Sequence, residues 1–313
     1  MKRGLHLRAA IGAALLWLAA LAPAQAQSVL YATGVGSGPG AGLSALYTVD
    51  PFTGASTLLW NFPGIHIYNG GLAYDAASDK LYATGVEDSS TGTSRLFAID
   101  RFTGAVTSLP GIDSSINLSS GGLAIHPQSG VMYATGSNGF QSHALFTLDT
   151  STGAATLIGQ AGGQCCAVPF GFNLNGLGFR DDGTLFANGF TLDATTSEAA
   201  YSHLFTVNLQ TGAASDIGSH GVTAGRLLAY SGLAFRDDGT LLSLGSMSAS
   251  AGGLYSVDPA TGAATLLGGT LVNYGVDGGL AFAPLAAIPE PQTTALLLAG
   301  LGLLGFAARR RLK

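Results

Sequence analysis

One 15-residue segment occurs five times in this chain, and this repeat constrains the fold more than any other feature of the sequence. Each copy has two short apolar–polar alternating stretches, the pattern of half-buried strands, around an Asp-x-x-Thr-Gly link. A short Asp or Asn side chain accepts hydrogen bonds from nearby backbone N–H groups, and Gly adopts the left-handed conformation, so the link predicts a hairpin turn. The copies are LYTVDPFTGASTLLW (46–60), LFAIDRFTGAVTSLP (96–110), LFTLDTSTGAATLIG (145–159), LFTVNLQTGAASDIG (204–218) and LYSVDPATGAATLLG (254–268).

A second motif alternates with the first and predicts another hairpin. Its copies are GGLAYDAASDKLYATG (70–85), GGLAIHPQSGVMYATG (121–136), NGLGFRDDGTLFANG (175–189) and SGLAFRDDGTLLSLG (231–245). Its expected turns lie at Ser78-Asp79, Ser129-Gly130, Asp182-Gly183 and Asp238-Gly239. Two hairpins give four strands in each period, and the Asp-x-x-Thr-Gly links are 50, 49, 59 and 50 residues apart. Periods of this length with four strands are typical of β-propeller blades.

The two ends of the repeat region predict a closed ring. The region opens with SVLYATG (28–34), which matches only the second half of the 70–85 motif, and closes with GGLAFAP (278–284), which matches only the first half. Together they complete a fifth hairpin and leave no long exposed strand edge. We therefore predict an all-β fold: a five-bladed β-propeller of four-stranded blades, closed by pairing of the N- and C-terminal strands. Blade one would take its innermost strand from 279–283 and the others from 29–60; a linear array or two stacked sheets is the alternative.

The first 26 residues have the layout of a secretory signal peptide. Three basic residues precede an apolar run from Ala9 to Leu21, and Ala24 and Ala26 form an A-x-A site. We expect cleavage after Ala26, with an uncleaved N-terminal anchor as the alternative. The predicted organisation is therefore a signal peptide (1–26), a propeller domain (27–287) and a C-terminal segment (288–313).

The C-terminal segment places Pro289-Glu290-Pro291 before an apolar stretch from Thr293 to Ala308 and a basic cluster from Arg309 to Lys313. The stretch predicts a short transmembrane helix whose basic end stays cytoplasmic. A plain tail anchor would also fit these features.

The order of these three elements resembles the PEP-CTERM sorting signal of Gram-negative, exopolysaccharide-making bacteria. The resemblance covers 288–313 and implies recognition of Pro289, Glu290 and Pro291 by an exosortase-type membrane transpeptidase. It further implies a protein that uses the secretion machinery, is anchored transiently in the inner membrane by the helix, and then reaches the cell surface or the extracellular matrix.

The charge of the predicted propeller domain excludes one class of partner. Of the 18 acidic residues only Glu290 lies in the C-terminal segment, while seven of the 13 basic residues lie in the two terminal segments, so the body has a net charge near −11. Nucleic acid needs a basic surface, so we predict no nucleic-acid partner.

By resemblance to other propellers, the expected binding region is the central channel and the face formed by the loops that lead into the five innermost strands. Functional residues often lie on loops held by a rigid scaffold. These loops vary in sequence where the strands do not, and they collect polar and aromatic residues. The ligand-binding candidates are His66, Tyr68, Asn69, Asn117, Asn173, Asn175, Arg226, Tyr230, Asn273, Tyr274 and Asp277.

Catalytic and metal constellations are poor in this sequence. A glycosidase needs two carboxylates beside one bond, and these loops contain only Asp277 and, at some remove, Asp113. The six histidines have no metal-site spacing, so we predict no metal and no catalytic residue.

Cys165 and Cys166 are the only cysteines, and in an oxidising compartment they are candidates for an adjacent disulfide, with free thiols and intermolecular pairing as alternatives.

The repeat also resembles quinoprotein-type propeller repeats of the form LYxxDxxTGxxxW. Only Trp60 fills the final position; the other copies have Pro110, Gly159, Gly218 and Gly268 there. We therefore expect no cofactor. A nearer likeness is to exported bacterial propellers of uncharacterised function with LYxVDPxTGAxTLLG repeats, which implies the fold and no activity.

These observations predict a non-catalytic binding or structural module, with extracellular polysaccharide as a candidate partner. The alternative is an extracellular glycan hydrolase or lyase with its site in the propeller channel. Acidic and aromatic side chains gathered at one channel mouth would favour the enzyme, and a glycine-lined or leucine-plugged channel would favour the module.

Overall fold

A computed structural model describes residues 28–35, 44–67, 70–87, 93–118, 121–139, 141–161, 172–191, 201–221, 232–248, 251–270 and 278–285. The chain divides into a unit of residues 29–283, which contains the repeats, and a unit formed by the two ends. The expected signal peptide, the Pro289-Glu290-Pro291 segment and the expected transmembrane helix lie outside the described residues. Within the described ranges, no helix is long and apolar enough to span a membrane.

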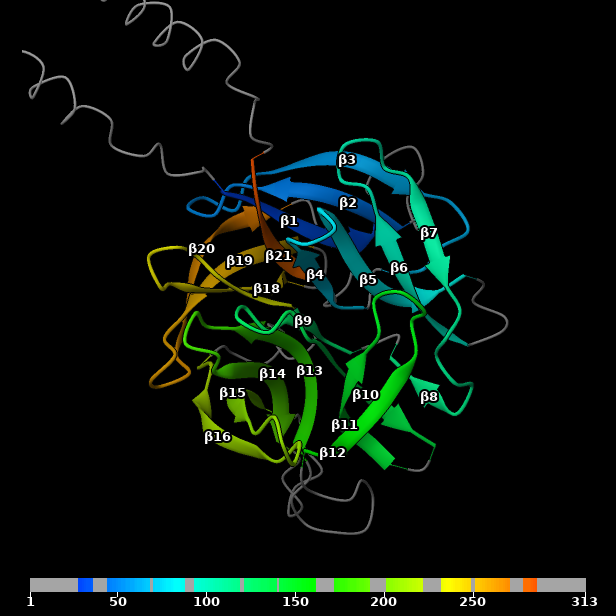
Figure 1. The fold of residues 1–313 in the computed structure, drawn as a ribbon. Coiled ribbons are helices and arrows are strands. Elements are labelled where there is room, and N and C mark those ends of the chain that lie inside the picture. Colours follow the sequence, from blue (N-terminus) through cyan, green and yellow to red (C-terminus); the bar gives the residue numbers. More distant parts are fainter. Residues whose placement is uncertain are drawn as a thin grey trace, which may run out of the picture. The chain divides into compact units, whose positions relative to one another are not determined.

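The repeat unit consists of five antiparallel sheets, each one blade of a β-propeller (Figure 1). Blade one contains β21 (Leu280–Pro284), β1 (Ser28–Val35), β2 (Ser44–Val49) and β3 (Ser56–Phe62). Blade two contains β4 (Leu72–Asp75), β5 (Lys80–Val86), β6 (Ser94–Ile99) and β7 (Val106–Leu109).

Blade three contains β8 (Ile116–Asn117), β9 (Leu123–Ile125), β10 (Met132–Asn138), β11 (Gln141–Leu148) and β12 (Ala155–Gln160). Blade four contains β13 (Phe172–Phe179), β14 (Leu185–Thr191), β15 (Tyr201–Val207) and β16 (Ala214–Ser219). Blade five contains β17 (Leu233–Phe235), β18 (Leu241–Ser248), β19 (Ala251–Val257) and β20 (Ala264–Thr270).

The predicted architecture and its closure are confirmed, because β21 pairs with β1 and thereby completes blade one. Blade three has an extra short strand because its innermost strand is in two pieces. Both β8 and β9 pair with β10. In blade four the corresponding strand is continuous but shifts register between Leu174 and Leu177.

The Asp-x-x-Thr-Gly links form the predicted hairpin turns. In the first, Asp50 Oδ1 accepts hydrogen bonds from the backbone N–H groups of Phe52 (2.8 Å) and Thr53 (3.1 Å). In the fourth, Asn208 Oδ1 accepts the equivalent bonds at 2.8 and 3.1 Å. The link glycines have positive φ, for example +74° at Gly54 and +71° at Gly104, which explains why Gly fills this position in every copy.

Five apolar clusters, each shared by two neighbouring blades, form the core. Between blades two and three, for example, Tyr82 and Leu96 share a cluster with Met132 and Phe146. The ring closes because Leu242 and Leu254 of blade five share a cluster with blade one, including the buried Tyr47. Full burial of each such side chain is worth about 1.5–3 kcal/mol, so blade-to-blade packing stabilises the ring.

Each link glycine also lies against the outermost strand of the preceding blade. A Cβ on Gly54 would be 2.9 Å from the carbonyl oxygen of Gly268, and a Cβ on Gly104 would be 2.6 Å from the Trp60 ring. The remaining pairs are Gly153 with Leu109, Gly212 with Gly159, and Gly262 with Gly218. The repeated segment therefore joins neighbouring blades as well as turning the chain.

Candidate functional site at the propeller channel

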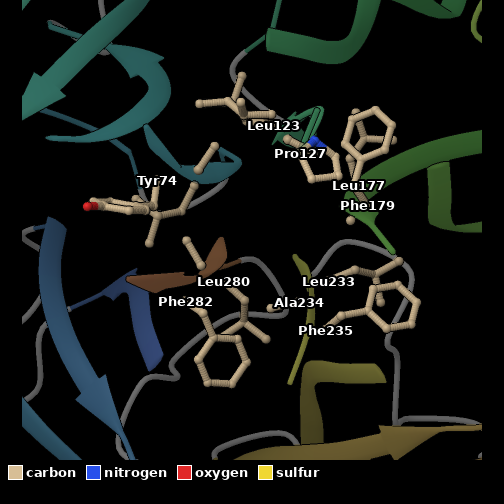
Figure 2. A pocket seen from close by; sticks show the side chains of 16 residues that line it. Tyr74, Leu123, Pro127, Leu177, Phe179, Leu233, Ala234, Phe235, Leu280 and Phe282 are labelled. Carbon is tan, nitrogen blue, oxygen red and sulfur yellow. The ribbon is translucent and has the colours of Figure 1, made fainter. Parts of the chain in front are cut away.

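A pocket of about 160 Å³ lies between the five innermost strands (Figure 2). Each of these strands contributes a leucine, then Ala or Gly, then an aromatic residue or Ile. The leucines are buried, whereas the aromatic residues and Ile125 are half-buried. The leucines are Leu72, Leu123, Leu177, Leu233 and Leu280, and the residues two positions later are Tyr74, Ile125, Phe179, Phe235 and Phe282.

The repeated Gly-Leu-Ala-aromatic pattern builds this pocket because consecutive strand residues point to opposite sides. Leu72 packs in the cluster shared by blades one and two, and Ala73 packs in the cluster shared by blades two and three. The small second residue lets the neighbouring blades approach each other close to the channel. Among the described residues that line the pocket, none is charged, and the phenol of Tyr74 is the only polar side-chain group.

Glycines bring the backbones of neighbouring blades together one residue before the leucines in the sequence. A Cβ on Gly122 would be 2.7 Å from the carbonyl carbon of Gly176, and one on Gly279 would be 2.7 Å from that of Gly71. Cβ atoms essentially never approach other atoms this closely, so only glycine allows these backbones to meet. The chain of contacts runs Gly232, Gly279, Gly71, Gly122, Gly176, and we call these five residues the glycine ring.

Buried threonines fix the backbone at the glycine ring. The hydroxyl of Thr135 accepts a hydrogen bond from Gly122 N (2.7 Å) and donates one to the carbonyl oxygen of Asn175 (2.8 Å). Thr84 and Thr33 accept from Gly71 N (3.0 Å) and Gly279 N (2.9 Å), respectively. These hydroxyls satisfy N–H groups that would otherwise be buried without a partner.

The arginines that follow two of the innermost strands form ion pairs with nearby aspartates. Arg236 Nη2 lies 2.6 Å from Asp238, and its guanidinium stacks 4.3 Å from the ring centre of Phe52 in blade one. The neighbouring Arg236 guanidinium holds the pKa of Asp238 well below its usual range.

Arg180 makes the same ion pair with Asp182. The Tyr74 hydroxyl donates to Asp79 Oδ1 (2.9 Å), and burial, followed by this carboxylate, raises the pKa of Tyr74. These side chains are thus held in ion pairs, a hydrogen bond and a stacking contact at the ends of the innermost strands, which is the geometry of structural groups.

A buried polar cluster joins blades four and five. His220 Nδ1 lies 2.7 Å from the carbonyl oxygen of Gly262, and its Nε2 lies 3.0 Å from Asn188 Oδ1. Asn188 Nδ2 donates to Ser243 Oγ (2.8 Å). His220 is only 1% exposed, and its burial lowers the pKa to about 4. The equivalent positions in blades one to three hold the apolar residues Phe62, Ile112 and Ala161.

Three sequence-predicted candidates have described side chains, and they lie before or within the innermost strands. His66 forms an isolated bridge with Val86, and its backbone N–H donates to the Val86 carbonyl (2.8 Å). Asn117 is exposed, and its Oδ1 accepts from Ser94 Oγ (3.2 Å). Asn175 is 5% exposed, so its side chain belongs to the interior.

The other sequence-predicted positions cannot be placed. Asn173 lies in β13, but its side chain is outside the described residues. Outside the described ranges lie Tyr68, Asn69, Arg226, Tyr230, Asn273, Tyr274, Asp277, Cys165 and Cys166. Binding by this set therefore stays a prediction. Within the described part of the chain, no group of three or more His, Cys, Asp or Glu side chains is arranged to hold a metal ion.

The sequence predicts the central channel as a site, but the residues that line this pocket were not among the sequence-predicted positions. These residues belong to the repeated Gly-Leu-Ala-aromatic motif, which in the sequence indicates scaffold rather than site. One signal in the sequence could have identified these residues. The motif lies in each expected innermost strand, and the innermost strands of a ring surround its axis, so its residues must line the channel.

Comparisons with known proteins identify the C-terminal segment. Residues 287–311 match the PEP-CTERM protein-sorting motif. The motif indicates an exported protein that carries a membrane-anchored sorting signal and is processed by exosortase, a membrane enzyme. It covers a small part of the chain and identifies no activity for the propeller. No curated protein sequence matches the chain.

Solved structures similar to this chain share the propeller fold. A GH43 glycoside hydrolase with an engineered active site is 13% identical, with a TM-score of 0.51. The alignment covers 84% of this chain and 53% of the hydrolase chain. TolB from Acinetobacter baumannii is 15% identical, with a TM-score of 0.46. The alignment covers 79% of this chain and 53% of the TolB chain.

A PQQ-bound aldose sugar dehydrogenase from Streptomyces coelicolor is 15% identical, with a TM-score of 0.36. The alignment covers 60% of this chain and 59% of the dehydrogenase chain. This chain thus spans about half the length of the TolB and GH43 structures. At these identities the likeness extends to the fold alone.

Proposed function

We propose that the propeller of this exported, exosortase-sorted protein is a non-catalytic binding or structural module, displayed at the cell surface or in the extracellular matrix, with exopolysaccharide as its candidate ligand. The sorting motif at 287–311 supports the destination. The chemistry of the channel supports the role of the module.

The observation that carries this proposal is the lining of the channel pocket. Hydrolysis of a glycosidic bond uses two carboxyl groups, about 5–9.5 Å apart, on either side of the bond. The pocket lining within the described residues contains no carboxylate and no basic side chain. Nearby Asp238 and Asp182 are held ionised by arginines, which is the opposite of what a general acid needs.

A glycan hydrolase or lyase is the alternative, and it rests on the fold that the chain shares with a glycoside hydrolase. One fold hosts many unrelated functions, so the fold alone gives this alternative little weight. The channel lining, which is built from leucines and small residues and has no charged side chain among the described residues, favours the module.

The sorting part of the proposal is tested with a processing variant. Replacement of Pro289, Glu290 and Pro291 by Ala should leave a longer form in the membrane fraction, because the recognition site of exosortase is removed. The matched control is Gln292→Ala, which changes the next residue and should be processed like the parent. Release of the triple variant at the parental size and rate would contradict exosortase-dependent sorting.

The display part is tested by fractionation. The processed protein should be found with the extracellular polysaccharide when cells are washed and their matrix is collected. Enzymatic removal of that polysaccharide should release it. Full recovery of the processed protein in polysaccharide-free medium would contradict the proposed module.

A further inference from the structure

The pocket between the innermost strands presents an unusual mixture of groups. Its side chains are apolar apart from the Tyr74 phenol, which donates to Asp79. Its other polar groups belong to the main chain, because an innermost strand pairs with a neighbour along one edge only. The other edge has no partner strand in the sheets described, so its N–H and C=O groups face the axis.

The pairing pattern shows which main-chain groups face the axis. Thr135 N donates to the Gly122 carbonyl (3.1 Å), and Thr33 N donates to the Gly279 carbonyl (3.1 Å). Residues of an antiparallel pair alternate between bonding to the partner and facing away from it. The N–H and C=O groups of Leu123 and Leu280, the next residues, therefore point away from the partner strand and toward the channel.

The size of the pocket sets the size of the ligand. A cavity of 150 Å³ lined by Leu, Ile and Phe accommodates a benzene molecule, so about 160 Å³ accommodates one six-membered ring. The glycine ring brings neighbouring backbones together beside the leucines, and the volume of the pocket leaves room for one ring and not for several. The pocket thus fits the end of a chain and not an internal stretch.

The charge around the pocket sets the charge of the ligand. The arginines that follow the innermost strands, Arg180 and Arg236, are already paired with Asp182 and Asp238. None of the described residues that line the pocket is charged, so an anionic group inside it would lack a counter-charge from them, which is strongly unfavourable.

We infer that this pocket binds the neutral terminal ring of a glycan. The C–H faces of one hexopyranose-sized unit pack against the leucines and aromatic rings, and its hydroxyls exchange hydrogen bonds with the inward-facing main chain, since a hydroxyl both donates and accepts. The inference rests on the proposed function and deepens it, because it gives the binding module a site and a ligand class.

The test is calorimetric titration of the full-length chain, purified in detergent, with glucose, galactose, rhamnose and glucuronate. At least one neutral sugar should bind, and glucuronate should bind at least tenfold more weakly than glucose or not at all. The blocking variant is Pro127→Trp, which adds bulk at an exposed residue of the pocket lining. It should weaken neutral-sugar binding at least tenfold without lowering the melting temperature.

The matched control is Val131→Trp, which adds the same bulk at a residue that is 38% exposed and outside the pocket lining. It should bind like the parent. If Pro127→Trp does not fold, Ile125→Trp blocks the same mouth from a half-buried position.

Three results would overturn the inference: no binding of any neutral sugar, equal binding of glucuronate, or parental affinity in the folded blocking variant. The outcome is separable from that of the proposed function. Matrix association that persists in the blocking variant leaves the module in place and removes the pocket. A parent chain that binds sugar but does not associate with the matrix leaves the pocket in place and removes the proposed module.

Discussion

Substitution of Gly104 tests the finding that the repeated turn also joins two blades. Gly104 has φ +71°, and a Cβ there would lie 2.6 Å from Cδ2 of Trp60 in the preceding blade. An L-residue in this conformation costs about 1–2 kcal/mol. Overpacking against the indole adds about 1–3 kcal/mol, so Gly104→Ala should cost about 2–5 kcal/mol.

The chain contains a matched control for the conformational part of this cost. Gly130 has φ +70°, but a Cβ there would have no neighbour within 4 Å. Gly130→Ala should therefore cost only about 1–2 kcal/mol. The difference between the two losses, measured by urea unfolding, is the contribution of the contact between blades.

A double-mutant cycle isolates the contact further. In a Trp60→Ala background the indole is gone, so Gly104→Ala should cost about as much as Gly130→Ala. Equal losses for Gly104→Ala and Gly130→Ala in the parent would refute the docking role of the turn.

A substitution in the same turn tests whether the repeated Asp is a structural turn residue or a calcium ligand. Asp100 Oδ1 accepts from the N–H groups of Phe102 (2.9 Å) and Thr103 (2.9 Å), and Asn208 already accepts the equivalent bonds in the fourth copy. Asp100→Asn should therefore change the melting temperature little, with or without a chelator. Strong calcium stabilisation of the parent that the variant lacks would make the repeat a set of metal sites.

Three other predictions concern the ring and its interior. Deletion of 278–284 removes β21 and exposes the edge of β1, so the chain should aggregate or melt without cooperativity; unchanged calorimetric melting would contradict closure by these strands. Gly122→Ala places a Cβ 2.1 Å from the Asn175 carbonyl oxygen, so it should cost at least about 3 kcal/mol by urea unfolding, and a loss no larger than that of Gly130→Ala would refute the glycine ring. Burial lowers the pKa of His220 from 6.5 to about 4, so the unfolded chain binds a proton at higher pH than the folded chain does. The free energy of unfolding should therefore fall by about 3 kcal/mol as the pH drops from 6.5 to 4. His220→Gln should flatten this pH dependence, and an unchanged slope in the variant would contradict the prediction.

Sequence reasoning reached the blades because the determinants of each hairpin are local. A left-handed glycine, an Asx side chain and a few alternating residues specify a turn within one segment, and Gly54 and Asn208 behave as that chemistry requires. Ring closure followed from two half-motifs at the ends of the repeat region. Their fit could be judged without any knowledge of packing.

Contacts between blades were not predictable in the same way. The approach of Gly104 to Trp60 joins residues more than 40 positions apart, and the cluster of His220, Asn188 and Ser243 depends on how two blades pack. The channel was expected as a site, but the residues that line its pocket were missed because the candidate residues were taken from the variable loops. In a ring, repeated positions such as Leu72 and Leu280 meet at one place, so a repeated motif can build a site that no single copy contains.

The most direct test of the central claim, that the propeller binds glycan and does not cleave it, is a size-exclusion measurement. The host's extracellular polysaccharide is incubated with the full-length chain, and both the bound protein and the polysaccharide length are followed over time. The account predicts that the protein elutes with the polysaccharide and that the length distribution does not change. Progressive shortening of the polysaccharide would contradict the account and establish the hydrolase or lyase in its place.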